Sequence, residues 1–141
     1  MSASKAWFRA SREALGLTQQ DVADAMDVRI TTVKRWERPG FPEPPGDASA
    51  WLADCLRMQR EIVDAGASAA AANCSSGGSA TVAYYRTQEQ YDELGGSPGP
   101  VGMANANARM VAQRLEHMGY DVRFEYPDDH GCEPCSDKDA R

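Results

Sequence analysis

Apolar residues recur every three or four positions through the first 65 residues of the chain, which is the spacing of amphipathic helices. This pattern predicts three short helices, over residues 4–15, 18–26 and 30–37, and one longer helix from Asp47 or Ser49 to about Ala65. A proline-rich segment ends the third helix, because proline cannot donate the amide hydrogen bond that a helix interior needs. The positions that we expect to face inward are Trp7, Phe8, Ser11, Ala14 or Leu15, Val22, Ala23, Met26, Val28, Val33, Trp36, Trp51, Leu52, Cys55, Leu56, Ile62 and Val63.

The chemistry of the turn between the second and third helices is visible in the sequence. Thr18 is a favourable N-cap, and Asp21, three residues later, completes a capping box at the start of the second helix. Asp27 falls at the turn, where the backbone needs left-handed angles that glycine prefers and aspartate tolerates. Two short helices that meet steeply through such a turn form a helix-turn-helix.

The pattern changes after the fourth predicted helix. A run of small residues predicts a flexible linker over residues 67–80, although its alanines would extend the preceding helix by a turn or two. Beyond the linker, alternating residues predict strands over 81–86 and 120–126, and helical spacing predicts helices over 88–94 and 103–118. In the second strand, Tyr120, Val122, Phe124 and Tyr126 share one face, and the clean alternation predicts that one face of the strand is buried and the other exposed.

These elements predict an α+β fold. We expect a helix-turn-helix domain in residues 1–66, a linker in 67–80, a β-α-α-β module in 81–126 and a disordered tail in 127–141. A two-stranded sheet with two helices has a thin core and is marginally stable alone. We therefore expect a homodimer that forms through residues 81–126.

Charge is distributed unevenly along this acidic chain, which carries a formal net charge of −6. Residues 1–46 hold seven basic and six acidic side chains, whereas the remainder holds eight basic and fifteen acidic ones. Four of the basic residues lie between Arg29 and Arg38, where there is only one acid. A local basic face of this kind is compatible with DNA binding, because the electrostatic field at the contact surface, and not the net charge of the chain, determines whether DNA is attracted.

Other features of the sequence argue against a membrane protein, a metal-binding protein and an enzyme. No apolar run is long enough to cross a membrane, and charged residues interrupt the N-terminal segment, so we expect a cytoplasmic protein with reduced cysteines. His130, Cys132 and Cys135 offer three zinc ligands, which Asp128 or Asp129 would complete on paper. Because no second CxxC pair is present, we expect a polar tail without metal. The sequence contains no nucleophile motif and no phosphate-binding glycine loop, so we expect neither enzymatic activity nor a cofactor.

Several residues at fixed spacing resemble the Cro/C1-type (Xre family) helix-turn-helix over residues 4–65. They are Gly16-Leu17-Thr18-Gln19-Gln20-Asp21-Val22-Ala23, then Val28, Thr32-Val33 and Arg35-Trp36-Glu37. The resemblance implies double-stranded DNA as partner, with the third helix in the major groove and an ion pair between Arg12 and Glu37. The residues that it places at the DNA are Gln19, Arg29, Ile30, Thr31, Thr32, Lys34, Arg35 and Arg38.

The resemblance also assigns roles within this set. Arg35 is the candidate for a two-pronged contact to guanine, Ile30 or the Thr31 methyl would meet thymine, and Gln19 would bind phosphate. Arg29 and Arg38 would bracket the groove on phosphates. Arg29 replaces the usual capping residue of the family, which leaves open whether it contacts phosphate or base.

Layout and pattern along the whole chain are similar to the anti-CRISPR-associated autorepressors, which pair a Cro/C1 domain with a dimerisation module. We therefore expect a repressor or autorepressor that binds an inverted-repeat operator as a homodimer. An antitoxin whose C-terminal half binds a toxin is the alternative. A protein-interaction adaptor would remain only if the basic face failed to bind DNA.

Overall fold

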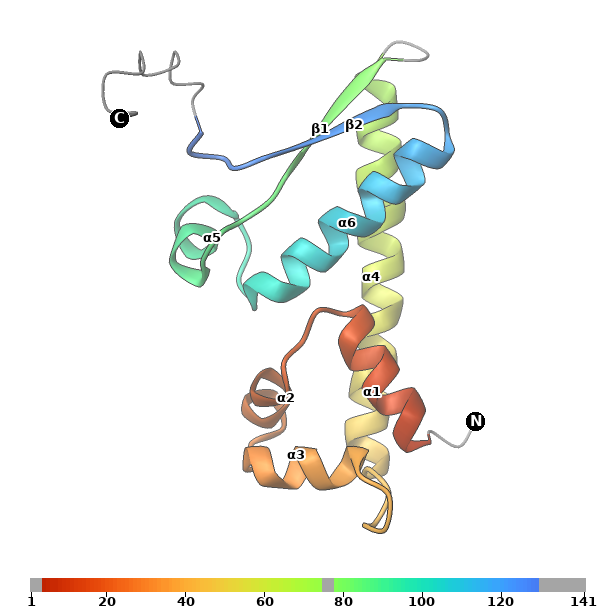
Figure 1. The fold of residues 1–141 in the computed structure, drawn as a ribbon, viewed down its shortest axis with the longest axis vertical. Helices are drawn as coiled ribbons and strands as arrows, with labels where there is room; N and C mark the ends of the chain where they lie inside the picture. The colour runs from red at the N-terminus through yellow and green to blue at the C-terminus, as the bar shows by residue number, and fades with distance from the viewer. Residues whose placement is uncertain (1–3, 75–77, 130–141) are drawn as a thin grey trace, which may run out of the picture.

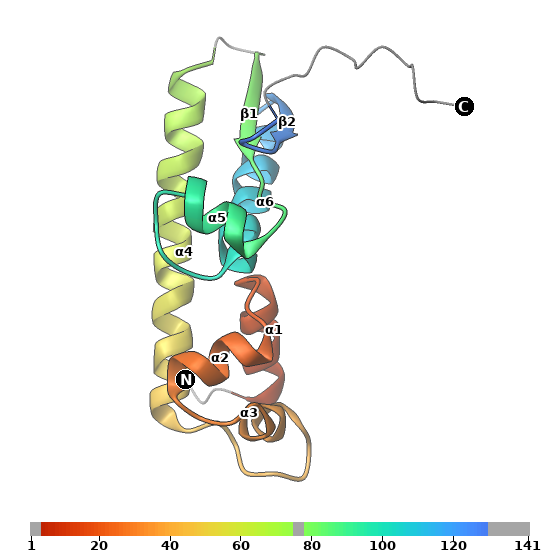
Figure 2. The same ribbon diagram turned by 90° about the vertical axis from the view of Figure 1, so that its left-hand side faces the viewer.

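The computed structural model describes residues 4–74 and 78–129 and contains six helices and two strands in that part of the chain. The N-terminal half holds α1 (Lys5–Ala14), α2 (Gln19–Met26) and α3 (Ile30–Glu37). A long helix, α4 (Gly46–Ala72), connects it to β1 (Ser79–Ala83), α5 (Gln88–Leu94), α6 (Val101–His117) and β2 (Asp121–Glu125). The molecule is elongated, with α3 near one end of α4 and the two strands near the other (Figures 1 and 2).

The first three helices begin and end where local chemistry predicts. The Ser4 side chain accepts a hydrogen bond from the amide of Trp7 at the start of α1. Thr18 and Asp21 form the complete capping box of α2, and Asp27 takes left-handed angles at its C-cap, with φ 55° and ψ 49°. These helices and the first turns of α4 enclose one apolar core. Its buried members are Phe8, Leu15, Leu17, Val22, Ala23, Val33, Trp36, Ala48 and Leu52.

Helix α4 is longer than the sequence predicts. It begins at Gly46 without a side-chain cap and continues to Ala72, so residues 67–72 are helical, not a flexible linker. Alanine favours helix, and the second half of α4 packs on α6, where the backbone of Gly66 lies close to Val111. Residues 79 and 80, also assigned to the linker, belong to β1, and residues 75–77 lie outside the described residues.

The packed face of α4 also differs at two positions. Ile62, expected to face inward, is 49% exposed. Gln59 is buried instead, and its side-chain amide donates a hydrogen bond to the carbonyl of Ala14 at the end of α1. That bond satisfies a carbonyl that a helix C-terminus leaves without an internal partner, which explains the buried polar side chain.

The C-terminal half follows the predicted β-α-α-β order, and its two strands pair in parallel, with Ala80 opposite Val122 and Val82 opposite Phe124. The first strand ends at Ala83, three residues before its predicted end. There the buried amide of Asn105 bonds both the N–H and the carbonyl of Tyr85, which takes this backbone out of the sheet.

The predicted burial of the second strand is wrong in large part. Phe124 is 47% exposed and Tyr126 42% exposed, although Phe124 lies on the same face as the half-buried Val122. Met118 at the end of α6 is also exposed, at 52%. Within the described residues, no element covers this edge of the small sheet.

The two halves meet directly at the start of α6. Gly16 follows α1 with a φ of 70°, and a Cβ built on it would lie 2.1 Å from the carbonyl oxygen of Gly102. A Cβ on Gly102 would lie 2.2 Å from the carbonyl oxygen of Gly16. Met103, next in α6, packs against the N-terminal core. The relative orientation of the halves is therefore set by backbone contact and by the shared helix α4.

Candidate nucleic-acid interface

The turn between α2 and α3 fixes the angle between these two helices. The left-handed Asp27 reverses the chain, and the amide of Val28 donates to the carbonyl of Ala23 at 3.0 Å. Val33 and Trp36 anchor α3 in the core, where the Trp36 ring meets Phe8 edge-on with centroids 5.8 Å apart. One face of α3 is thereby buried and the opposite face is presented to solvent.

The exposed face of α3 carries most of the residues predicted to contact DNA. Thr31, Lys34 and Arg35 are exposed on the helix, and Arg29 and Arg38 are exposed at its two ends. The ion pairs among the described residues involve none of these four cations. The basic side chains of α3 are therefore available to a ligand.

Two of the predicted contact residues are placed differently. Ile30 is half-buried and packs against the core, so only part of its side chain faces outward. Thr32 is half-buried as well. Arg29 occupies the N-cap of α3 without a side-chain capping bond, as expected from the replacement of the usual capping residue there.

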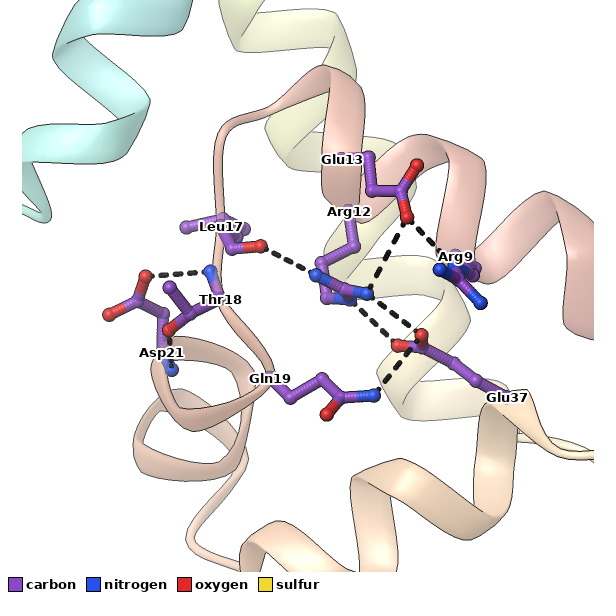
Figure 3. Close-up of polar contacts among 8 residues, drawn as sticks. All are labelled: Arg9, Arg12, Glu13, Leu17, Thr18, Gln19, Asp21 and Glu37. Atoms are coloured by element: carbon purple, nitrogen blue, oxygen red, sulfur yellow. Dashed lines mark hydrogen bonds and ion pairs between the residues drawn. The ribbon is translucent and has the colours of Figure 1, made fainter.

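The predicted ion pair between Arg12 and Glu37 is present and joins α1 to α3 (Figure 3). Its two parallel hydrogen bonds measure 2.7 Å from Nε to Oε2 and 2.9 Å from Nη2 to Oε1. The side chains are only 11% and 5% exposed, and Arg12 also donates to the carbonyl of Leu17 at 2.9 Å. This two-pronged geometry holds α3 at a fixed orientation.

Gln19 belongs to the same cluster. Its side-chain amide donates to Oε1 of Glu37 at 3.4 Å, so it points from α2 toward the carboxylate that Arg12 also contacts (Figure 3). Gln19 is also the first residue of α2, where backbone N–H groups lack helical partners and favour an anion. The side chain of Gln19 thus reaches the C-terminal end of α3.

Lys5 also fixes this C-terminal end of α3. Its ammonium donates to the carbonyls of Arg35 and Trp36, each at 3.0 Å, and to that of Pro42 at 2.9 Å. A cation at a helix C-terminus compensates both the unpaired carbonyls and the helix dipole. Lys5 therefore ties α1, α3 and the following loop together.

Two hollows on this surface contain residues that sequence reasoning missed. One, of about 440 Å³, includes Arg9, whose Nε donates to Glu13 at 2.7 Å and lowers the pKa of that carboxyl. The other, of about 260 Å³, includes Phe41. The first is lined by Arg9, Gln19, Lys34, Glu37, Arg38 and Pro39, and the second by Thr31, Lys34, Arg35, Arg38 and Phe41.

The reason for each omission differs. Arg9 lies on the solvent side of α1, where a charged residue is ordinary, and only the fold brings it beside α3. Phe41 lies in a loop without periodicity, so hydrophobic spacing gives no prediction for it. The one signal in the sequence is that an aromatic residue occurs among prolines and glycines.

A second surface lies at the far end of the molecule, in a groove of about 490 Å³ along β2. The Tyr84 and Phe124 rings meet edge-on with centroids 5.7 Å apart, and Arg109 donates to the Tyr84 hydroxyl at 2.9 Å. The lining residues are Tyr84, Arg109, Phe124, Glu125, Tyr126 and Asp129.

The candidate zinc ligands His130, Cys132 and Cys135 lie outside the described residues, as does most of the predicted tail. Among residues 4–74 and 78–129, no helix is both long and apolar enough for a membrane span.

Comparison with known families places a helix-turn-helix model on residues 8–38. This segment runs from within α1 to the C-cap of α3 and contains Arg12, Glu37 and all four cations of the basic face. Residues 8–38 are therefore a helix-turn-helix of the Cro/C1 type, which is a DNA-binding fold. Among curated proteins, none matches the chain.

Proposed function

We propose that this protein is a sequence-specific transcriptional repressor or autorepressor that binds an inverted-repeat operator as a homodimer. The observation that carries the proposal is the basic face of α3, whose cations form no ion pair within the described residues. Arg12–Glu37 and Lys5 hold the C-terminal end of this helix. A helix that is held at its C-terminal end by these contacts and at its N-terminal end by the turn through Asp27 and Val28 presents its side chains to the major groove in one orientation, which sequence reading requires.

The proposed contacts follow from position along α3. Arg35, exposed at the centre of the face, reads a guanine through its two-pronged guanidinium, and Thr31, one turn earlier, contacts a neighbouring base. Lys34 and Arg38 line both hollows and contact the backbone with Arg29. Arg9 and the α2 N-terminus at Gln19 add phosphate contacts beside them. Thr32 and Ile30, both half-buried, contribute packing at the edge of the interface.

The proposed dimer uses the C-terminal half. Its parallel sheet has only two strands in the described residues, and such a sheet is marginal alone. The exposed Phe124 and Tyr126 along one edge offer apolar area that a second copy would cover. In the elongated molecule, α3 lies at the end opposite the two strands, so a dimer joined at the strands leaves α3 of each copy open to DNA (Figure 1).

Selection of bound duplexes from a random DNA pool tests the function. We expect an enriched inverted repeat with the wild-type chain and its loss with Arg35→Ala. Arg60→Ala, an exposed arginine of α4 outside the basic face, is the matched control for the loss of one charge and retains the selection. Folded wild-type protein that enriches no sequence at low salt would overturn the proposal.

Sedimentation of the full chain tests the dimer. Phe124→Ser should shift the equilibrium towards monomer, whereas Ile62→Ser, at a comparably exposed apolar residue on α4, should not. Dissociation by Ile62→Ser alone would place the interface on α4 and refute the use of residues 81–126.

The antitoxin alternative gains no specific support from the structure, and a toxin partner would show itself by copurification. The cytoplasmic location also remains a prediction.

A further inference from the structure

The loop that follows α3 returns an aromatic ring to the DNA-facing surface. Phe41 is 39% exposed, and the guanidinium carbon of Arg35 lies 5.7 Å from the centre of its ring. Both residues line the hollow of about 260 Å³ on the outer face of α3. An apolar ring that remains exposed beside the central base-reading candidate calls for an explanation other than core packing.

The loop conformation holds the ring in this position. Gly40 turns the chain with a φ of 88°, a value that strains residues with a Cβ. The ammonium of Lys5 bonds the carbonyls of Pro42 and Arg35 simultaneously, at 2.9 and 3.0 Å. The residue after Phe41 and the backbone of Arg35 are therefore attached to the same cation, which fixes the distance between ring and helix.

The Arg35 side chain needs a contact that restricts its conformation before it binds DNA. Its long side chain has many rotamers, and among the described residues no ion pair restricts its guanidinium. A guanidinium over an aromatic face is attracted by the ring quadrupole. The contact reduces the conformational freedom that Arg35 would otherwise lose on binding.

We propose that Phe41 is a positioning residue for DNA reading, which holds the Arg35 guanidinium in place for its base contact through the face of its ring. This inference rests on the proposed function and adds to it a determinant of specificity outside the helix. Because Phe41 carries no charge, its effect should fall on base preference and not on the salt dependence of binding.

The experiment compares Phe41→Leu, which keeps an apolar side chain without a ring, with Phe41→Tyr, which keeps the ring. On the operator selected by the wild-type chain, Phe41→Leu should weaken binding about two- to fivefold, the equivalent of an exposed cation–π contact. It should also relax the preference at the base lost with Arg35→Ala, with an unchanged salt slope. Phe41→Tyr should retain wild-type affinity and preference.

The same substitution in an Arg35→Ala background separates positioning from direct contact. If Phe41 acts through Arg35, Phe41→Leu has no further effect there. An equal loss in both backgrounds overturns the positioning role, and so does a Phe41→Leu variant with wild-type affinity and preference. If the wild-type chain selects no operator, the proposed function fails first and the role of Phe41 with it.

Discussion

The Arg12–Glu37 pair provides the sharpest quantitative prediction, because the same protein contains a matched exposed pair. Glu37→Gln preserves the shape of the side chain but leaves the Arg12 guanidinium, only 11% exposed, with the exposed Glu13 at 3.9 Å as its remaining counter-charge. Loss of one partner of a buried pair costs about 3–5 kcal/mol. Because Arg12 keeps its bond to the Leu17 carbonyl, we expect the lower end, about 3 kcal/mol, in the free energy of unfolding.

Urea unfolding followed by tryptophan fluorescence measures this loss, since all three tryptophans lie in the N-terminal domain or the first turns of α4. For a chain of this length the corresponding fall in Tm is roughly 6–12 °C. Glu13→Gln is the control: Arg9 and Glu13 also form a 2.7 Å contact, but their side chains are 65% and 55% exposed, and Glu13 lies 3.9 Å from Arg12, farther than Glu37 does. That substitution should leave stability nearly unchanged, because water screens the exposed pair.

Equal effects of the two substitutions would refute the argument that burial decides the strength of the Arg12–Glu37 pair. A double substitution to Met at both positions adds a second check. Apolar replacement of a buried pair is often neutral, so the double variant should be more stable than Glu37→Gln.

Three further predictions concern the Gly16–Gly102 contact between the two halves, the thiol of Cys55 and the C-terminal end of α3. Gly102→Ala should lower stability by about 1–3 kcal/mol in urea unfolding because its Cβ meets the carbonyl of Gly16, while Gly46→Ala, where the Cβ meets open space, should be neutral or stabilising. Burial raises the pKa of the Cys55 thiol, so alkylation of that residue should need a higher pH in the folded chain than in urea. Mass spectrometry measures the alkylation, and equal rates in the two states would contradict the burial. Lys5→Met should speed amide hydrogen exchange at the end of α3 while leaving α2 unchanged, and uniform exchange would assign Lys5 a global role.

Local chemistry explains why the first three helices are predictable from sequence. The hydrogen bonds of Ser4, Thr18 and Asp21 reach only three residues along the chain, so a short segment contains the whole signal. The Arg12–Glu37 pair spans 25 residues and follows from the family resemblance, which specifies both partners. Local rules alone would have left both as ordinary surface charges.

The missed features depend on distant partners. The alanines of residues 67–72 suit a linker or a helix equally, and the packing of α4 on α6 favours the helix. Alternation along β2 shows that its two faces differ but not which element covers either, so the exposure of Phe124 could not be predicted. Phe41 and Arg9 join the interface only through the folded arrangement of the loop and α1.

The single helix α4 sets the distance between the end of the molecule that would dimerise and the end that would contact DNA. Because α4 runs unbroken for 27 residues and the Gly16–Gly102 contact braces it, a dimer would hold its two α3 helices at one separation. Each base pair inserted between half-sites moves the second half-site by about 3.4 Å and turns it by roughly 35° around the DNA axis. A flexible tether would absorb such a change, whereas this braced rod would not. The operator should therefore tolerate base changes at its centre but not a change in its length.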